Sequence, residues 1–390
     1  MIFLDNAAGS WPKPKEVKDA VCQAFDQYGA NPGRGSYAFS LEGSKLLFAA
    51  RNRLAEFLGC ENPERMVFTS GATASINYAL QGFLKQGDHV VFSGMEHNAV
   101  WRTLANLENV GRITATCVKA NRDGVVAPGD FEKAIRPSTR LLVCLHVSNV
   151  CGSVQPIEAI GAIAKKRGIA FMVDTAQSAG LLPVDAEKMN ISLLAIAGHK
   201  ALYGPTGIGA LYVSDKIELS PLIYGGTGSR STFWQQPDFF PEHLEAGSHH
   251  MLGIAGLLAG VDFIVHNGLD NIYEKTTYLS DYFIDGIIEI PGIHIYHPEG
   301  NHIAKRNAVP VVSVTLDGME SGQLAYQLDS QYDIAVRSGL HCTPLAHHAL
   351  GTIDDGTTRF SFGYFNTKQE VITAIKALEA IAAQRRYNKP

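Results

Sequence analysis

Residues 169–174 read IAFMVD and residues 193–200 read LLAIAGHK, two short apolar runs that each lead into a polar residue. Runs of this length and composition are typical of strands buried on both faces of a sheet. Asp174 ends the first run and Lys200 follows the second, 26 positions later. This spacing suits one crossover between neighbouring parallel strands, which would bring both side chains to one sheet edge. The two stretches therefore predict an α/β fold.

The same alternation continues through the first two-thirds of the chain. Apolar runs at residues 66–68, 89–92 and 140–147 lead into helical patterns at 74–84, near Val100 and at 157–167. This order predicts a largely parallel sheet covered by helices on both faces. In such sheets, functional residues gather in loops beyond the carboxyl ends of the strands. The polar residues that fall there are Thr73, His97, Asn149, Asp174 and Lys200.

The pattern changes from roughly Val309 onward. Strand-like segments at residues 309–316, 334–336 and 358–362 surround a helical pattern at 323–328. A last helix opens with Thr367-Lys368-Gln369-Glu370, which has the form of a capping box, and continues with apolar residues at helical spacing. These features predict a smaller α+β domain.

Composition favours a globular protein that acts on a small molecule. The chain has 390 residues, 46% of them hydrophobic, and a formal net charge of -5, with no block of Lys and Arg that would indicate nucleic acid. The longest apolar stretch, residues 251–261, is too short to cross a bilayer, and the amino terminus lacks the pattern of a signal peptide. The six cysteines show neither disulfide nor metal spacing, so we expect a reduced, cytoplasmic protein.

Asp174 and Lys200 carry the first chemical hypothesis. An acid at the end of a buried strand needs a cation, and a protonated pyridine nitrogen is such a partner. A helix N-cap explains Asp174 equally well on its own. A lysine held between an apolar run and a glycine-rich stretch is partly desolvated, which lowers its pKa and frees its amine to attack an aldehyde. The alternative for Lys200 is an ordinary lysine at a strand edge.

Two loops nearby could contact a phosphorylated, planar cofactor. Residues 70–73 (SGAT) stand between a strand and a helix, where free backbone N–H groups and the helix dipole favour a phosphate. The segment lacks the lysine and the length of a P-loop, so a nucleotide is disfavoured. His97 follows another strand and could stack on a flat ring or move protons, although a lone histidine is more often structural.

The second domain offers a thiol and a buried cation. Cys342 lies in the polar loop 337–344, where Arg337 and His341 could keep it a nucleophilic thiolate; the alternative is an unreactive loop thiol. Arg359 stands in an apparent strand and needs an anionic partner, either a substrate carboxylate or a structural acid. The histidine pairs at 249–250 and 347–348 lack metal-ligand spacing, so we expect no metal.

Taken in order, these segments resemble the class V aminotransferase group of fold-type I pyridoxal-phosphate (PLP) enzymes. The resemblance is to cysteine desulfurases of the SufS-like and NifS-like group, which also includes selenocysteine lyases. It spans nearly the whole chain and rests on residues 4–8, 69–73, 96–97, 146–150, 174–178, 198–200, 337–344, 359 and 364–367.

The resemblance implies a fold and a cofactor. It implies a large PLP-binding domain at residues 15–255, with a mostly parallel sheet of the seven-stranded type. It implies a small α+β domain formed by residues 1–14 and 256–390. Lys200 would hold PLP as a Schiff base, Asp174 would pair with the pyridine nitrogen, Gln177 would bind the phenolic oxygen and His97 would stack on the ring. Other expected cofactor-binding residues are Ala72, Thr73, Asn149, His199 and, across a dimer interface, Ser248.

The resemblance also implies a reaction and partners. Arg359 and Asn149 would hold the substrate carboxylate. Cys342 would take sulfur from L-cysteine as a persulfide, releasing L-alanine, before transfer to a sulfur-acceptor protein. Such enzymes are homodimers. No membrane or nucleic-acid partner is expected.

Some positions depart from the usual pattern of the group. Tyr37 and Leu340 replace common histidines, and residues 225–230 and 247–250 also differ. These changes leave open whether the substrate is cysteine, selenocysteine or a related amino acid. They also leave open a PLP-dependent C–S lyase or class V aminotransferase in which Cys342 forms no persulfide. A non-catalytic PLP-fold or metal-binding partner protein is a further alternative.

Overall fold

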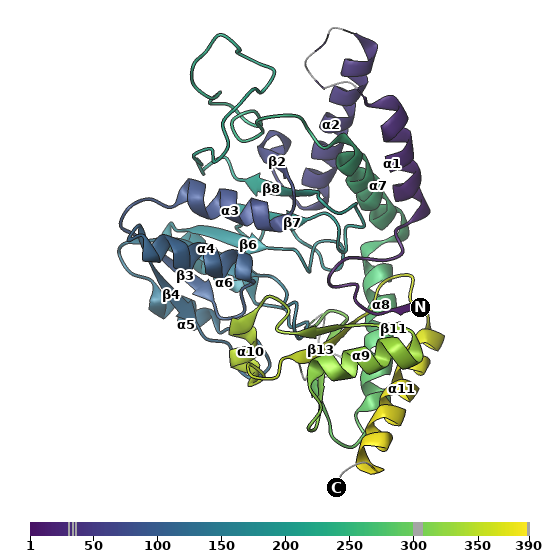
Figure 1. The fold of residues 1–390 in the computed structure, drawn as a ribbon. Helices are drawn as coiled ribbons and strands as arrows, with labels where there is room; N and C mark the ends of the chain where they lie inside the picture. Colours follow the sequence, from purple (N-terminus) through teal and green to yellow (C-terminus); the bar gives the residue numbers. More distant parts are fainter. Residues whose placement is uncertain (30–31, 33–34, 36, 299–306, 388–390) are drawn as a thin grey trace.

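The fold is built on a mixed sheet, seen here in a computed structural model that describes residues 1–29, 32, 35, 37–298 and 307–387 (Figure 1). Within these residues the main sheet has seven strands in the order β2-β8-β7-β6-β5-β3-β4. The strands are β2 (Met66–Thr69), β3 (Asp88–Ser93), β4 (Ile113–Val118), β5 (Thr139–Leu145), β6 (Ala170–Asp174), β7 (Leu193–Ala197) and β8 (Gly209–Val213).

The sheet is mostly parallel, as the sequence predicts. Strands β4, β3, β5, β6 and β7 pair in parallel, and β8 runs antiparallel to both of its neighbours, β2 and β7. Asp174 pairs with Ala195 across β6 and β7, so both strands end at the same edge. The predicted juxtaposition of the two strand ends is therefore confirmed.

Helices cover both faces of this sheet, which explains why its central strands are continuously apolar. On one face, α3 (Ala72–Phe83) and α4 (Asn98–Asn109) pack on residues such as Met172. On the other, a larger cluster that includes Phe171 and Val173 packs against α1 (Lys15–Gln27), α2 (Ala38–Phe57), α5 (Pro128–Ala134), α6 (Ile157–Arg167) and α7 (Met251–Asn267). Alternate residues of β6 thus belong to opposite cores.

A second, antiparallel sheet lies in the C-terminal part, in the order β12-β13-β10-β9. Its strands are β9 (Ile293–Tyr296), β10 (Val311–Leu316), β12 (Arg337–Gly339) and β13 (Thr357–Ser361). They accompany α8 (Leu269–Ile287), α9 (Ser321–Tyr332), α10 (Pro344–Leu350) and α11 (Lys368–Tyr387). The predicted capping box is confirmed, because the Glu370 carboxylate accepts from the Thr367 N–H and the Thr367 hydroxyl accepts from the Glu370 N–H.

The amino terminus joins this second unit. Strand β1 (Ile2–Phe3) pairs in parallel with β11 (Ile334–Ala335), and Leu4 lies in the same apolar core as α8, α9 and α11. The division into residues 15–255 and the remainder stays a prediction, and its second boundary falls inside α7.

No single helix among the described residues combines the length and apolar content needed to cross a bilayer. Within the described part of the chain, one pair of helices, α7 and α8 taken together, passes on length and composition, and the two helices meet at 84°.

Candidate functional site

A cavity of about 310 Å³ opens where the strand ends of the main sheet meet the antiparallel sheet. It gathers nearly all the site residues predicted from the sequence. The predicted residues that line it are Ala72, Thr73, His97, Asn149, Asp174, Gln177, His199, Lys200 and Arg359. Residues from elements as distant in sequence as α3 and β13 therefore meet in one pocket.

Two predicted residues do not line this cavity. Cys342 is exposed on the loop whose neighbours Arg337 and His341 do line it. Ser248, expected to act across a dimer interface, lies outside the residues that form the cavity of this chain. The role assigned to Ser248 stays a prediction.

Asp174 is buried at the carboxyl end of β6 with one oxygen already in use. Its Oδ1 accepts the backbone N–H of Ala176 at 2.8 Å, and only 6% of the residue is exposed. This bond is the local capping interaction that was the alternative explanation for Asp174. The residue nevertheless also lines the cavity. A buried carboxylate with spare acceptor capacity suits a cationic partner.

Lys200 shares the cavity with this carboxylate. Burial lowers the pKa of its amine to about 8, while the charge of Asp174 opposes that shift and the guanidinium groups of Arg359 and Arg337 reinforce it. The backbone of Lys200 is fixed, because its carbonyl accepts from the Ser10 hydroxyl at 2.9 Å. Near neutral pH a substantial fraction of the amine is therefore uncharged and nucleophilic.

The two predicted histidines are held in neutral forms. Burial lowers the pKa of His97, and its Nδ1 accepts the Ala99 N–H at 3.0 Å, which caps α4. Burial likewise lowers the pKa of His199 to about 4. The buried Nδ1 of His199 has no hydrogen-bond partner within the described part of the chain. An unpaired polar atom in a cavity wall is a place for a ligand contact.

The amino end of α3 forms a cradle in the cavity wall. Gly71 precedes the helix with φ of 142°, a conformation that side chains disfavour. Behind it, a Cβ added to Gly209 would stand 2.6 Å from the Gly71 Cα, so the two backbones pack closely. Ser70, Ala72 and Thr73 complete this wall. Free N–H groups at the start of a helix attract an anion such as phosphate.

The Cys342 loop is strained and firmly anchored. His341 and Cys342 have φ of 48° and 59°, left-handed values that cost energy for residues other than glycine. The Asn98 N–H binds the Cys342 carbonyl at 2.8 Å, and Asn149 Nδ2 binds the His341 carbonyl at 2.7 Å. The Thr343 hydroxyl donates to Asn149 Oδ1 at 2.8 Å. Contacts with the main-sheet unit thus hold the thiol in this conformation.

His341, beside this thiol, is fixed as one tautomer. The Ser313 hydroxyl donates to the Val150 carbonyl, and the Thr357 hydroxyl donates to Ser313 (2.7 and 3.1 Å). Thr357 must therefore accept from His341 Nε2, 3.0 Å away, which leaves Nδ1 without a proton. Burial first, and then the charge of Arg359, hold the pKa of His341 far below its usual range. The ring stays neutral.

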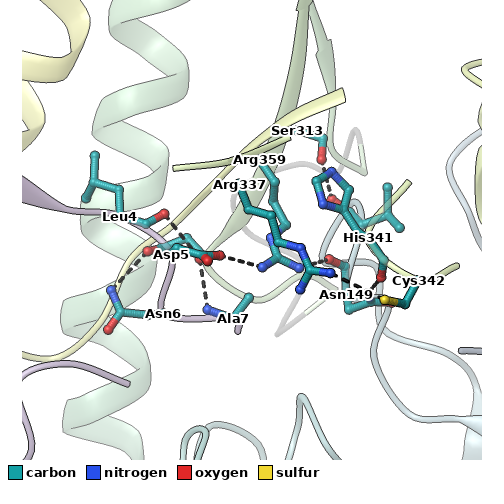
Figure 2. Close-up of polar contacts among 12 residues, drawn as sticks. Leu4, Asp5, Asn6, Ala7, Asn149, Ser313, Arg337, His341, Cys342 and Arg359 are labelled. Atoms are coloured by element: carbon teal, nitrogen blue, oxygen red, sulfur yellow. Dashed lines mark hydrogen bonds and ion pairs between the residues drawn. The ribbon is translucent and has the colours of Figure 1, made fainter. Parts of the chain in front are cut away.

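Two arginines face each other across β12 and β13, where Arg337 and Arg359 are direct register partners (Figure 2). Arg337 Nη2 lies 3.3 Å from Cys342 Sγ. Arg359, 1% exposed, binds Asp5 through Nη2 at 2.6 Å and the Asn149 carbonyl through Nη1 at 2.9 Å. The anionic partner predicted for Arg359 is thus the structural acid Asp5.

Asp5 was not among the predicted site residues, whereas Arg337 was predicted only as a neighbour of Cys342 and not as a residue of the cavity wall. The signal for Arg337 was its place in the polar loop of Cys342. For Asp5 no local signal points to a partner 354 positions away. Together the site offers an amine of lowered pKa, a buried carboxylate, an anion cradle, two guanidinium groups and a thiol.

Comparisons with known proteins place this site in a family. The model of the class V aminotransferase family matches residues 2–373. A probable cysteine desulfurase of Methanothermobacter thermautotrophicus is 34% identical, over 98% of this chain and 94% of the relative. A cysteine desulfurase of Haloferax volcanii is 33% identical, over 97% of this chain and 89% of the relative.

Solved structures agree with this placement. The apo structure of a cysteine desulfurase from Thermococcus onnurineus superposes with a TM-score of 0.91 at 31% identity, covering 98% of this chain and 95% of the other. A cysteine desulfurase from Escherichia coli gives 0.86 at 27% identity, with coverage of 98% and 94%. Because the family match and the similarity to these relatives extend over almost its full length, the chain belongs to the class V aminotransferase family.

Proposed function

We propose that the protein is a PLP-dependent cysteine desulfurase that converts L-cysteine to L-alanine and retains the sulfur on Cys342. The observation that carries the proposal is the position of the thiol. Cys342 Sγ contacts Arg337, a lining residue of the cavity that holds Lys200 and Asp174. The names of the relatives in Methanothermobacter thermautotrophicus and Haloferax volcanii support the same reaction.

The residues present fit PLP. The α3 cradle and the unpaired Nδ1 of His199 suit its phosphate. Asp174 suits its pyridinium nitrogen, and the amine of Lys200 suits its aldehyde. Gln177 would bind the phenolic oxygen with the N–H left over from its bond to the Ala7 carbonyl at 2.9 Å. When bound, the cofactor supplies an electron sink for the bonds around the substrate α-carbon.

The chain positions the substrate and moves its protons. Arg359 and Asn149 would bind the substrate carboxylate, and Lys200 Nζ would carry a proton to and from the α-carbon. His97 would stack on the cofactor ring, since its capping bond to Ala99 fixes the imidazole beside the cavity.

Cys342 is the nucleophile of the proposed sulfur transfer. Its thiolate, with Sγ 3.3 Å from Arg337 Nη2, attacks the substrate sulfur. A sulfur–sulfur bond forms while the substrate carbon–sulfur bond breaks, and that carbon keeps the electron pair and takes up a proton. L-cysteine and one thiol thus become L-alanine and one persulfide. A selenium analogue of cysteine would fit the same scheme.

A second copy of the chain is part of the proposal. Phe25 on α1, Phe48 on α2 and Trp234 are exposed, and these elements lie at the end of the molecule away from the antiparallel sheet (Figure 1). A cavity of about 520 Å³ lies in the same region, lined by Phe48, Thr227 and others. Exposed apolar side chains favour contact with a second copy of the chain, which would bring Ser248 to the opposite site. A sulfur-acceptor protein and a cytoplasmic location stay predictions.

Product analysis tests the proposal. The PLP-loaded protein is incubated with L-cysteine and a reductant, beside Cys342→Ala and, as a matched thiol control, Cys22→Ala on the exposed face of α1. We expect alanine and sulfide in equal amounts, lost in Cys342→Ala and retained in Cys22→Ala. Pyruvate and ammonia, or activity indifferent to Cys342, would instead indicate a C–S lyase.

A further inference from the structure

Asp5 is the acid that neutralises the buried guanidinium of Arg359. The two side chains are 2.6 Å apart, with 1% of the Arg359 side chain and 20% of the Asp5 side chain exposed. Burying a cation is costly unless an anion meets it. Here the anion lies two positions after the end of β1, far from β13 in sequence. The pair therefore connects the amino terminus to the candidate substrate site.

The charge balance around Asp5 leaves the cavity positive. Arg337 and Arg359 are cross-strand neighbours, and two like charges placed directly opposite each other are destabilising. Both arginines line the cavity, whereas Asp5 is not among its lining residues. Asp5 thus offsets part of this repulsion from outside the cavity wall. The wall itself keeps a net positive charge that suits a carboxylate.

The hydrogen bonds of Arg359 set its orientation. Nη2 is bound to Asp5 and Nη1 to the Asn149 carbonyl (Figure 2), while the buried Nε has no partner among the residues that the structure describes. A guanidinium held on two sides cannot rotate freely. The remaining N–H groups are then aimed in a fixed direction, as two-pronged carboxylate binding requires.

The backbone beside Asp5 is itself anchored to both units. Asp5 forms a β-bridge with Ser361, two positions from Arg359 on β13. The Ala7 N–H binds the Ser361 hydroxyl, and the Ala7 carbonyl accepts from Gln177, each at 2.9 Å. A carboxylate on such a segment is preorganised and does not have to be ordered when substrate arrives.

We infer that Asp5 is a positioning residue that fixes Arg359 to receive the substrate carboxylate, and that it remains paired with Arg359 when substrate binds. The inference deepens the proposed function and rests on it. Asp5 acts on the carboxylate-binding step and leaves the amine and thiol chemistry to other residues.

The test compares ligands that differ only in the carboxylate. L-alanine and ethylamine are titrated into the PLP-loaded wild type and the Asp5→Asn, Asp5→Glu and Asp5→Ala variants, following the visible absorbance of the bound cofactor. Asp19→Asn, which removes an exposed acid paired with Lys15, is the matched control. Melting temperatures and the kcat and KM for L-cysteine are measured for each protein.

We expect Asp5→Asn and Asp5→Ala to raise the Kd of L-alanine and the KM of L-cysteine at least about tenfold, the scale of one hydrogen bond to a charged group. The Kd of ethylamine and kcat should change less than about threefold, well below that scale. Asp5→Glu should recover part of the affinity because it keeps the charge, and Asp19→Asn should match the wild type.

Two results would overturn the role of Asp5, and a third would overturn the proposed function. Unchanged or tighter L-alanine binding in Asp5→Asn overturns the inference, since Asp5 would then be a competitor of the substrate or a bystander. Equal weakening of both ligands together with a lower melting temperature also overturns it, because the role would be structural. If the wild type responds to neither ligand, the proposed function fails first, and the inference fails with it.

Discussion

Nη2 of Arg337 donates a hydrogen bond to Sγ of Cys342 across 3.3 Å, and Arg337 lines the cavity that also contains Lys200. The contact joins the only exposed thiol of the antiparallel-sheet unit within the described residues to a guanidinium that is always charged. A thiolate beside a fixed cation is stabilised, and the thiolate is the reactive form.

Removing that cation should slow the chemistry of the thiol. We expect Arg337→Gln to reduce the rate of Cys342 alkylation by iodoacetamide about three- to tenfold near neutral pH, the effect of losing one adjacent charge. Peptide-resolved mass spectrometry measures the rate, with exposed Cys22 as internal reference. Equal alkylation rates in the variant and the wild type would show that Arg337 does not activate the thiol.

The pH dependence of the rate of PLP loading should reflect the lowered pKa of Lys200. Because burial brings that pKa to about 8, the uncharged amine increases about tenfold between pH 7 and pH 9 and then reaches a plateau. The rate at which the apoprotein gains covalently bound PLP absorbance should follow this curve and vanish in Lys200→Ala. A rate that kept rising toward pH 10.5 would indicate an ordinary, solvated lysine.

A buried histidine should make the protein sensitive to acid. Burial lowers the pKa of His347 to about 4, while its Nδ1 contacts the Thr352 hydroxyl at 2.7 Å. Between pH 6.5 and 4 the unfolded chain binds a proton there and the folded chain does not. The free energy of unfolding therefore decreases as the pH is lowered from 6.5 to 4, by about 1.4 kcal/mol per pH unit for this one group.

Denaturant unfolding of the apoprotein from pH 7 to pH 4 measures this loss. His347→Gln should reduce the slope of the unfolding free energy against pH by the amount that corresponds to about one bound proton. The variant of the exposed neighbour, His348→Gln, is the control. Identical slopes in wild type and His347→Gln would mean that the group titrates equally in both states.

Arg51 and Glu245 form a buried ion pair that supports the segment containing Ser248. Each guanidinium Nη lies 2.9 Å from one carboxylate oxygen, and the carboxylate also accepts the Phe68 N–H and His249 Nε2. Removing Arg51 leaves the buried carboxylate without its permanent cation, with only His249 and the Phe68 N–H as partners. We expect Arg51→Met to cost about 3–5 kcal/mol in denaturant unfolding, and Arg51→Met with Glu245→Met to cost less. A double variant less stable than the single would exclude this explanation.

Elements with continuous apolar composition were predictable from the sequence. Residues 193–197 and 157–167 form β7 and α6 with the expected bounds, because burial on both faces or at helical spacing leaves a clear pattern. Strand β4 was given no bounds, since ITATCV is partly exposed at an edge of the sheet and lacks that pattern. Strand β8 was not predicted, and its antiparallel direction depends on tertiary pairing.

The candidate site was predictable only in part, for a related reason. Asp174 and Lys200 follow neighbouring strands, so their spacing predicts that they meet. By contrast, the Asp5–Arg359 pair and the anchoring of Cys342 by Asn98 and Asn149 join distant segments whose local sequences carry no sign of each other. Such contacts arise from the packing of the two units.

Detection of the transferred sulfur on Cys342 tests persulfide formation without an intermediate step. The PLP-loaded protein is treated with L-cysteine without reductant, alkylated and digested. The mass of the peptide containing Cys342 is then measured by mass spectrometry. We expect one additional sulfur atom on that peptide, matched by an equivalent of L-alanine and absent from Lys200→Ala. An unmodified Cys342 peptide in a sample that has turned over L-cysteine would contradict it.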